Sequence, residues 1–124
     1  MLTSIVIATH DAGEMLLDAP HGAARTDMLE AIASLLRTLA RVGARHPDLN
    51  VKNILLTVDS DGPLHAYVLD VDRIVFGTPD DARIAQANVK RLTRSFRKWR
   101  DHRQVTVSEE ELSWLATAAT RSEP

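Results

Sequence analysis

Apolar residues recur at intervals of three and four between positions 26 and 42. This spacing places them on one face of a helix, and it predicts an amphipathic α-helix over that stretch. Thr26 or Asp27 can cap the start of the helix, and Gly43 can end it. The predicted buried face comprises Met28, Leu29, Ile32, Leu35, Leu36, Leu39 and Val42.

A second helical pattern follows the segment Gly77-Thr78-Pro79. Pro79 suits the first turn of a helix, and Asp80 and Asp81 are well placed against the positive end of the helix dipole. Phe96 and Trp99 continue the apolar stripe, so we interpret both as packing residues. The whole apolar face comprises Ile84, Val89, Leu92, Phe96 and Trp99.

A last, short helix is predicted from the capping-box pattern that Ser108 and Glu111 form. This helix runs through Leu112 and Leu115. We expect the chain from Thr120 onward to fray, because it has no apolar pattern that would hold it against a core.

Other parts of the chain carry the apolar patterns of strands. Residues 51–58 and 65–71 are two short β-rich runs around Asp59-Ser60-Asp61-Gly62-Pro63. The residue types of this middle segment favour a turn, so we expect an antiparallel hairpin. Residues 3–9 predict a further strand, which the polar segment His10-Asp11-Ala12-Gly13 ends. That strand is expected to be an edge or a connector.

Composition narrows the class of protein. The chain has 124 residues, 44% of them hydrophobic and 26% charged, which fits one domain over residues 1–124. The absence of cysteine excludes disulfides and thiolate metal sites, and the histidines lack the spacing of a zinc site. No apolar run reaches the ~18 residues of a membrane span, and no signal peptide is evident. We therefore expect a protein that is neither secreted nor membrane-spanning.

Basic residues gather in the second helical stretch, although the net charge of the chain is -2. Between positions 90 and 103 the sequence contains seven lysines and arginines and a single acidic residue, Asp101. Two interpretations are equally good: a solvated helix face, or a patch that attracts a phosphorylated, anionic glycolipid at a membrane surface. Nucleic-acid binding is disfavoured, because few aromatic residues lie among the cations. The cations are Lys90, Arg91, Arg94, Arg97, Lys98, Arg100 and Arg103.

The segment from His46 to Asn53 carries the residues of greatest chemical interest. Asp48 stands five positions before Asn53, directly ahead of an apolar strand. Phosphoryl transfer to a hydroxyl needs a carboxylate that orients the nucleophile and accepts its proton, together with oxygen ligands for Mg²⁺. Asp48 and Asn53 suit these roles. Asp70 stands at the end of the second hairpin strand, where it can return beside Asn53, and Asp72 has the same strand face available to it.

Three motifs in this order resemble the lipopolysaccharide kinases of the Kdo/WaaP family, which have a protein-kinase-like fold. The loop of that family commonly reads H-x-D-L-N-x-x-N-I-L, and residues 46–55 here read His-Pro-Asp-Leu-Asn-Val-Lys-Asn-Ile-Leu. The D-F-D-R motif of the family stands here as Asp70-Val71-Asp72-Arg73, in which valine keeps an apolar side chain in the place of phenylalanine. The family's helix motif N-x-x-R-L-x-R-S-x-x-K is similar to residues 88–98. The resemblance covers roughly residues 26–100.

The resemblance implies an α+β fold: a protein-kinase-like C-terminal lobe, mainly helical, with a β-hairpin that carries the catalytic site. Residues 1–20 would form a hinge-like segment, in which residues 5–8 would lie near the adenine of a nucleotide. Residues 21–120 would form the helical lobe, with the hairpin over residues 51–72.

The resemblance also implies roles for particular residues. Asp48 would be the catalytic base, and His46 would brace the loop that carries it. Asn53 and Asp70 would bind Mg²⁺, with Asp72 as a less certain ligand.

The activity implied by the resemblance is ATP-dependent phosphorylation of a sugar hydroxyl, on Kdo or heptose, in the lipopolysaccharide inner core. The cofactors would be ATP and Mg²⁺. The partner would be the lipopolysaccharide core or a lipid A precursor, with no nucleic acid. Such a kinase would act in the cytoplasm, peripherally at the inner face of the inner membrane.

Kinases of this superfold also carry a preceding lobe with a glycine-rich phosphate loop and a lysine held by a helical glutamate. These 124 residues contain no counterpart of it. We therefore expect the isolated chain to be catalytically feeble or silent unless a missing lobe or a partner chain completes it. Two alternatives remain open: a non-catalytic remnant that serves as a binding or regulatory module, and a small-molecule or protein kinase of the same superfold.

Overall fold

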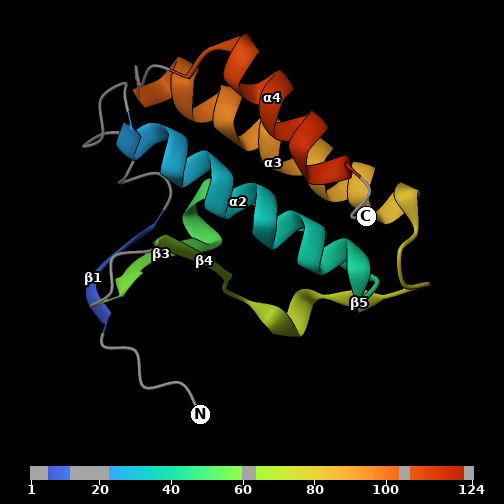
Figure 1. The fold of residues 1–124 in the computed structure, drawn as a ribbon. Coiled ribbons are helices and arrows are strands. Elements are labelled where there is room, and N and C mark those ends of the chain that lie inside the picture. The colour runs from blue at the N-terminus through green and yellow to red at the C-terminus, as the bar shows by residue number, and fades with distance from the viewer. Residues whose placement is uncertain (1–5, 12–22, 60–63, 104–106, 122–124) are drawn as a thin grey trace.

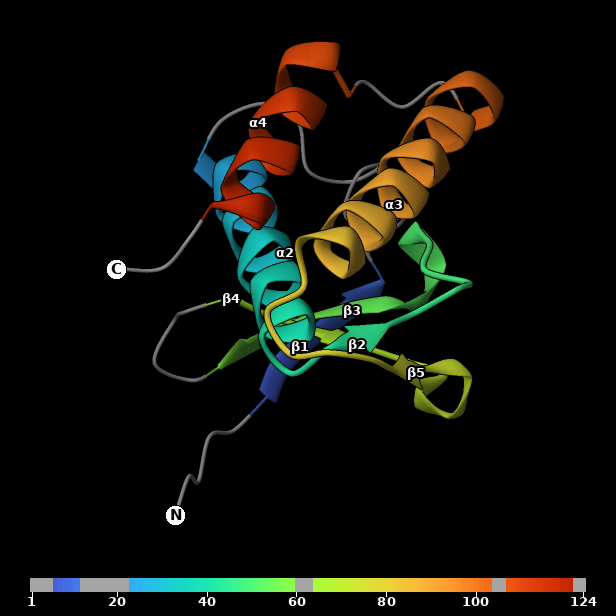
Figure 2. The same ribbon diagram turned by 90° about the vertical axis from the view of Figure 1, so that its right-hand side faces the viewer.

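The computed structural model describes residues 6–11, 23–59, 64–103 and 107–121 (Figure 1). Over these residues the protein is mixed α+β and mainly helical, with two small sheets. Helix α2 lies between the strands and α4, and α3 lies beside α4 (Figure 1, Figure 2). The helices are α2 (Ala23–Arg41), α3 (Ala82–Arg103) and α4 (Glu109–Thr120).

The larger sheet is antiparallel and has three strands in the order β1-β3-β4. The predicted hairpin is confirmed, since β3 and β4 pair with Thr57 opposite His65, whereas the turn at residues 60–63 lies outside the described residues. A smaller sheet pairs Ala44 with Phe76. The strands are β1 (Val6–Asp11), β2 (Ala44–Arg45), β3 (Ile54–Asp59), β4 (Leu64–Val68) and β5 (Val75–Phe76).

Three predicted strand boundaries are wrong. The first hairpin strand begins at Ile54, because the three residues before it form a short 3₁₀-helix, η1 (Val51–Asn53). The second hairpin strand ends at Val68, whereas the predicted run extended to residue 71. Strand β1 continues to Asp11, two residues into the polar segment expected to end it, because its pairing with β3 continues to that residue.

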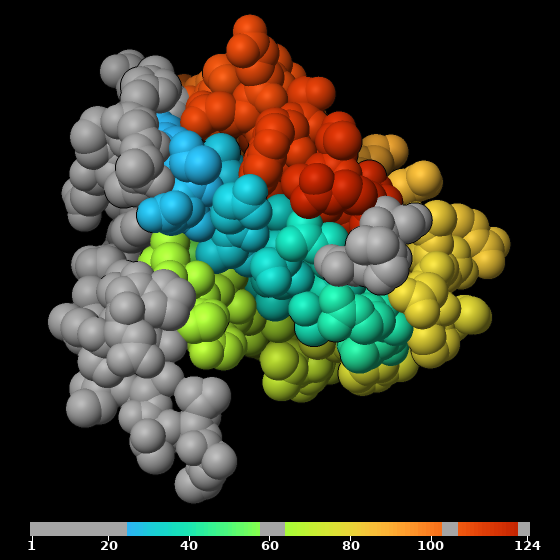
Figure 3. All heavy atoms as spheres, viewed as in Figure 1, coloured from blue at the N-terminus to red at the C-terminus, as the bar shows by residue number. Residues whose placement is uncertain are grey.

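Helix α2 has the predicted apolar stripe, with Met28, Ile32 and Leu36 almost fully buried. Its outer face is uncovered between the sheet and α4 (Figure 3). Because the helix begins at Ala23, the predicted caps Thr26 and Asp27 lie inside it. Val42 lies beyond the last turn and is 50% exposed, so its predicted burial is also wrong.

Gly43 ends α2, as predicted, and it is the position where glycine is required. Its backbone is left-handed, with φ of +74°, and its carbonyl accepts a hydrogen bond from the Gly77 amide at 2.7 Å. A Cβ atom at this position would lie 2.5 Å from the Gly77 carbonyl oxygen. Glycine avoids both the strain and the clash.

Helix α3 begins at Ala82, three residues later than the pattern predicted. Asp80, before the helix, instead hydrogen-bonds to the end of α2: its amide donates to the Ala40 carbonyl at 2.9 Å. Asp81 then starts α3: its carboxylate accepts a hydrogen bond from the Arg83 amide at 2.8 Å. The Arg83 side chain also bonds this carboxylate and lowers the pKa of Asp81.

Helix α4 begins with the predicted capping box. The Ser108 hydroxyl accepts from the Glu111 amide at 3.0 Å, and the Ser108 amide donates to the Glu111 carboxylate at 2.9 Å. The three helices and the sheet enclose one hydrophobic core, to which the fully buried Phe96 contributes from α3. None of the described helices combines the length and the apolar character that crossing a membrane requires.

Candidate active site

The loop between β2 and η1 carries the predicted catalytic residues, and His46 anchors it. The His46 side chain is 1% exposed. Its Nδ1 atom lies 3.2 Å from the Asp48 amide, and its Nε2 atom lies 3.0 Å from the Leu69 carbonyl oxygen. Because an amide can only donate, Nδ1 must accept, which assigns the ring proton to Nε2. The neutral ring therefore joins the loop to the segment that follows β4.

Asn53 closes the loop on itself. Its side-chain nitrogen donates to the Asp48 carbonyl at 2.9 Å, and its side-chain oxygen accepts from the Asn50 amide at 3.0 Å. The Asn50 side chain in turn accepts from the Lys52 amide at 2.8 Å, which completes a capping box around η1. These hydrogen bonds hold the amide group of Asn53 in one orientation next to Asp48.

Asp70 lies close to the loop because a hydrogen bond joins the chain just beyond the ends of the two hairpin strands. The Leu69 amide donates to the Asn53 carbonyl at 2.7 Å. The next residue, Asp70, has φ of 58° and ψ of 46°, a left-handed conformation that costs a non-glycine residue roughly 1–2 kcal/mol. Residues in such strained conformations cluster at functional sites, and this one turns the chain away from the strand direction beside Asn53.

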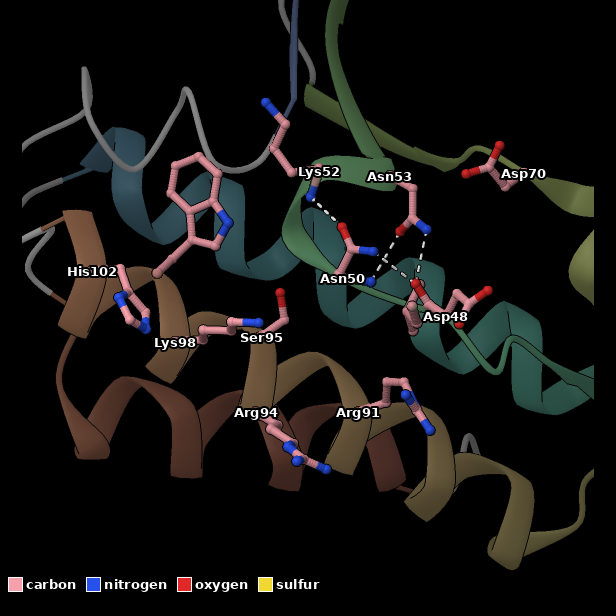
Figure 4. Close-up of a pocket in the computed structure, with 12 residues that line it drawn as sticks. Asp48, Asn50, Lys52, Asn53, Asp70, Arg91, Arg94, Ser95, Lys98 and His102 are labelled. Carbon is pink, nitrogen blue, oxygen red and sulfur yellow. Dashed lines mark hydrogen bonds between the residues drawn. The ribbon is translucent and has the colours of Figure 1, made fainter.

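Asp48, Asn53 and Asp70 line one cleft of about 870 Å³ (Figure 4). The structure thus brings together three of the residues that the sequence singled out. Asp72 is not among the described residues that line this cleft. It lies in a second 3₁₀-helix, η2 (Val71–Arg73), so its predicted place on a strand face is wrong.

Arg73 forms an ion pair that the sequence did not suggest. Its guanidinium nitrogen Nη1 donates to Oδ2 of Asp48 at 2.8 Å. Both side chains are substantially exposed, at 63% and 49%, so the pair contributes to orientation more than to stability. The only sequence signal was the position of Arg73 at the end of the Asp-x-Asp-Arg motif.

Two polar residues of α3, to which the sequence assigned no role, hold the loop from the other side. Asn88 is fully buried; its side chain accepts from the His46 amide and donates to the Ala44 carbonyl, both at 3.0 Å. The Ser95 hydroxyl accepts from the Val51 amide at 3.0 Å. A polar residue on the apolar face of a helix signals such a hydrogen bond, and Asn88 lies four positions from both Ile84 and Leu92 of that face.

Trp99 is only partly a core residue. Phe96 is fully buried, as predicted, whereas Trp99 packs against the core with part of its surface and also lines the cleft. The Lys52 ammonium lies 5.6 Å from the centre of the Trp99 ring, within the range of a cation–π interaction. Trp99 therefore connects the core to the wall of the cleft.

The cleft offers oxygen ligands that fit Mg²⁺. The Asp70 carboxylate is exposed, and the Asn53 amide oxygen, which accepts one hydrogen bond, has a second lone pair. Within the described part of the chain, no group of three or more His, Cys, Asp or Glu residues could hold a metal ion. One carboxylate and one amide suit Mg²⁺ nevertheless, because this ion retains several waters and needs few protein ligands.

The fold belongs to a known class of structure. It is similar to the structure titled "WaaP in complex with acyl carrier protein", with a TM-score of 0.71, over 96% of this chain and 50% of that one. The sequence identity is 17%, so this likeness concerns the fold. The model of the Lipopolysaccharide kinase (Kdo/WaaP) family matches residues 4–116. The chain belongs to this family.

Two curated relatives come from Xanthomonas oryzae pv. oryzae, strains PXO99A and KACC10331 / KXO85. Each is named "3-deoxy-D-manno-octulosonic acid kinase" and is 40% identical to this chain over 88 residues. The aligned part is 71% of this chain and 33% of each relative. The chain thus matches about a third of the length of these kinases.

Proposed function

We propose that this protein is an ATP-dependent phosphotransferase that acts on a sugar hydroxyl, on Kdo or heptose, in the lipopolysaccharide inner core. In this proposal the chain forms the C-terminal lobe of a protein-kinase-like enzyme at the cytoplasmic face of the inner membrane. The observation that carries the proposal is the shared cleft of Asp48, Asn53 and Asp70 in a member of this kinase family. The names of the two Xanthomonas relatives favour Kdo as the acceptor sugar.

Asp48 is proposed to be the catalytic base. Its Oδ2 atom is bound by Arg73, while Oδ1 receives no hydrogen bond from the described residues. This second oxygen can accept the hydrogen bond of an acceptor hydroxyl, orient it and take its proton. His46 and Asn53 hold the backbone of Asp48, one at its amide and one at its carbonyl, and so position the carboxylate for the acceptor hydroxyl.

Asn53 and Asp70 are proposed to hold Mg²⁺ and, through it, the phosphates of ATP. Bound there, the ion would neutralise charge on the transferring phosphoryl group. Asp72 stands outside the described lining of the cleft, so we leave it out of this ligand set.

Substitution of Asp48 and Asp70 tests the proposal. With radiolabelled ATP, Mg²⁺, a Kdo-containing lipid acceptor and a preceding kinase lobe or partner chain that completes the site, Asp48→Asn should lower transfer about 10²–10⁴-fold, because the amide cannot accept the proton. Calorimetry should show unchanged Mg²⁺-ATP binding for Asp48→Asn and weakened binding for Asp70→Asn. Asp27→Asn, an exposed change on α2, is the matched control.

The same measurements distinguish the alternatives. If the chain neither binds Mg²⁺-ATP nor transfers phosphate even when a preceding kinase lobe or partner chain is supplied, a non-catalytic binding or regulatory module is favoured. If small alcohols or a protein replace the Kdo-containing acceptor with equal rates, the fold is a kinase of another substrate class. If Asp48→Asn transfers phosphate as fast as the unaltered chain, the proposed base is wrong.

A further inference from the structure

Two groups of basic side chains on α3 have different surroundings. Arg97 and Arg100 both bind the carboxylate of Glu109 on α4, at 3.0 Å and 2.8 Å. Arg100 also lies 3.6 Å from Asp101. The positive charge of these two arginines is therefore balanced by acidic side chains of the protein itself.

The second group lies in the cleft, and we call it the cleft stripe. Its side chains make no ion pair or hydrogen bond with the described residues. Its members recur at steps of three and four, so they lie along one side of α3, and they span about 16 Å at a rise of 1.5 Å per residue. The cleft stripe consists of Arg91, Arg94, Lys98 and His102.

The position of the cleft stripe relative to Asp48 indicates what it binds. In Figure 4 the loop from Asp48 to Asn53 lies between Asp70 and the side chains of the stripe. Asp70 therefore marks one side of Asp48, and the stripe lies on the other side. In phosphoryl transfer the attacking and leaving oxygens are roughly in line, so the acceptor approaches from the side opposite the nucleotide.

We propose that the cleft stripe binds the acid groups of the acceptor, carboxylates or phosphates, and so places its hydroxyl at Asp48. This inference rests on the proposed function, because it takes Asp70 to be on the nucleotide side. Arginine and lysine are the side chains that recognise carboxylate and phosphate by charge-assisted hydrogen bonds. Successive cations about one helical turn apart suit an acceptor that carries more than one acid group. A neutral sugar would leave these cations without a counter-charge.

The test measures binding of a water-soluble acceptor to the full 124-residue chain by calorimetry. The probe is the deacylated Kdo–lipid A backbone, which carries carboxylates and phosphates. The double substitution Arg94→Gln with Lys98→Gln should weaken its binding about tenfold or more, since two charge-assisted contacts are lost. Lys90→Gln is the control: this lysine is exposed on the same helix but does not line the cleft, and its loss should change the affinity less than about twofold.

Two treated probes identify the acid groups. Dephosphorylation leaves only carboxylates, and esterification of the carboxyl groups leaves only phosphates as anions. Whichever treatment abolishes the effect of the double substitution names the group that the cleft stripe binds. A probe with both kinds of group removed should bind the unaltered and the doubly substituted chain equally weakly.

The outcomes separate this inference from the proposed function. If the double substitution leaves binding of the probe unchanged, or weakens only Mg²⁺-ATP binding, the inference is overturned while the phosphotransferase can stand. If the probe binds through the cleft stripe but Mg²⁺-ATP does not bind and no phosphate is transferred even with a completing lobe or partner chain, the proposed function fails and the acid-binding site remains. Thermal melting of each variant establishes that a loss of binding is not a loss of folding.

Discussion

At the scale of single residues, His46 explains why the candidate base is held in place without being buried itself. The Asp48 side chain is about half exposed, so its own packing cannot orient it. The ring of His46 is buried and uses both nitrogens, one toward the Asp48 amide and one toward the Leu69 carbonyl. The loop and the approach to Asp70 are therefore fastened to a single rigid group.

This arrangement predicts the effect of His46→Phe. Phenylalanine retains the ring but leaves the Asp48 amide and the Leu69 carbonyl without their partner. We expect the free energy of unfolding to fall by about 1–3 kcal/mol, the cost of leaving such polar groups unsatisfied. Urea denaturation measures the change. His65→Phe, at an exposed position on β4, should stay within about 0.5 kcal/mol, and an equal loss at both positions would contradict the bracing role.

At the scale of elements, the contact between α3 and α4 depends on both apolar packing and charge. Leu92 and Phe96 of α3 and Leu112 and Leu115 of α4 belong to the common core. At the edge of this contact, Glu109 in the first turn of α4 accepts hydrogen bonds from Arg97 and Arg100. These bonds, first that of Arg97 and then that of Arg100, lower the pKa of Glu109 from 4.5 to about 2.

A lowered carboxyl pKa predicts a definite dependence on pH. Since Glu109 releases its proton more readily in the folded chain, its contribution is complete above pH 4.5 and is lost as the pH falls toward 2. Glu109→Gln should lower the melting temperature slightly at pH 7, because the group is exposed and screened. The difference in melting temperature between Glu109→Gln and the unaltered chain should shrink as the pH falls from 4.5 toward 2. Glu110→Gln, one residue away and without this pair of arginines, should show a smaller difference at pH 7; equal effects would argue against the ion pairs.

At the scale of the whole molecule, the sequence predicted the elements better than their connections. The helices and the hairpin follow from local periodicity, and Ser108 identified the start of α4 because a capping box is complete within four residues. The start of α3 was missed because Asp80 and Gly77 hydrogen-bond to the end of α2, some forty positions earlier in the chain. A local pattern contains no information about such a partner.

For the candidate site, too, the sequence predicted some features and not others. Asp48 and Asn53 could be singled out because they stand ahead of an apolar strand in a segment that resembles the loop of the Kdo/WaaP family. Asp70 could be singled out because the predicted hairpin returns it beside Asn53. The ion pair between Arg73 and Asp48 could not be predicted from the sequence, and neither could the pairing of Arg97 and Arg100 with Glu109. Both depend on which surfaces the fold brings into contact. The three-dimensional arrangement thus adds partners to residues that the sequence had already singled out.

Asn88 is the residue through which this long-range arrangement can be tested. It joins α3 to the chain on both sides of Arg45, because its amide group bonds the Ala44 carbonyl and the His46 amide. Asn88→Leu keeps a similar volume but leaves both backbone groups unpaired in the interior, so the free energy of unfolding should fall by about 2–4 kcal/mol. Gln86→Leu, exposed on the same helix, should change it by less than about 0.5 kcal/mol.

Hydrogen exchange gives this substitution a readout beyond stability. In Asn88→Leu the His46 amide should exchange faster relative to the core amides of α2, because its hydrogen bond is gone while the helices remain packed. Mg²⁺-ATP binding should weaken in parallel, since the loop that carries Asn53 would be less well held. If instead all amides accelerate together, Asn88 supports the fold as a whole, and the contact between α3 and the loop of residues 46–53 is not a separate unit.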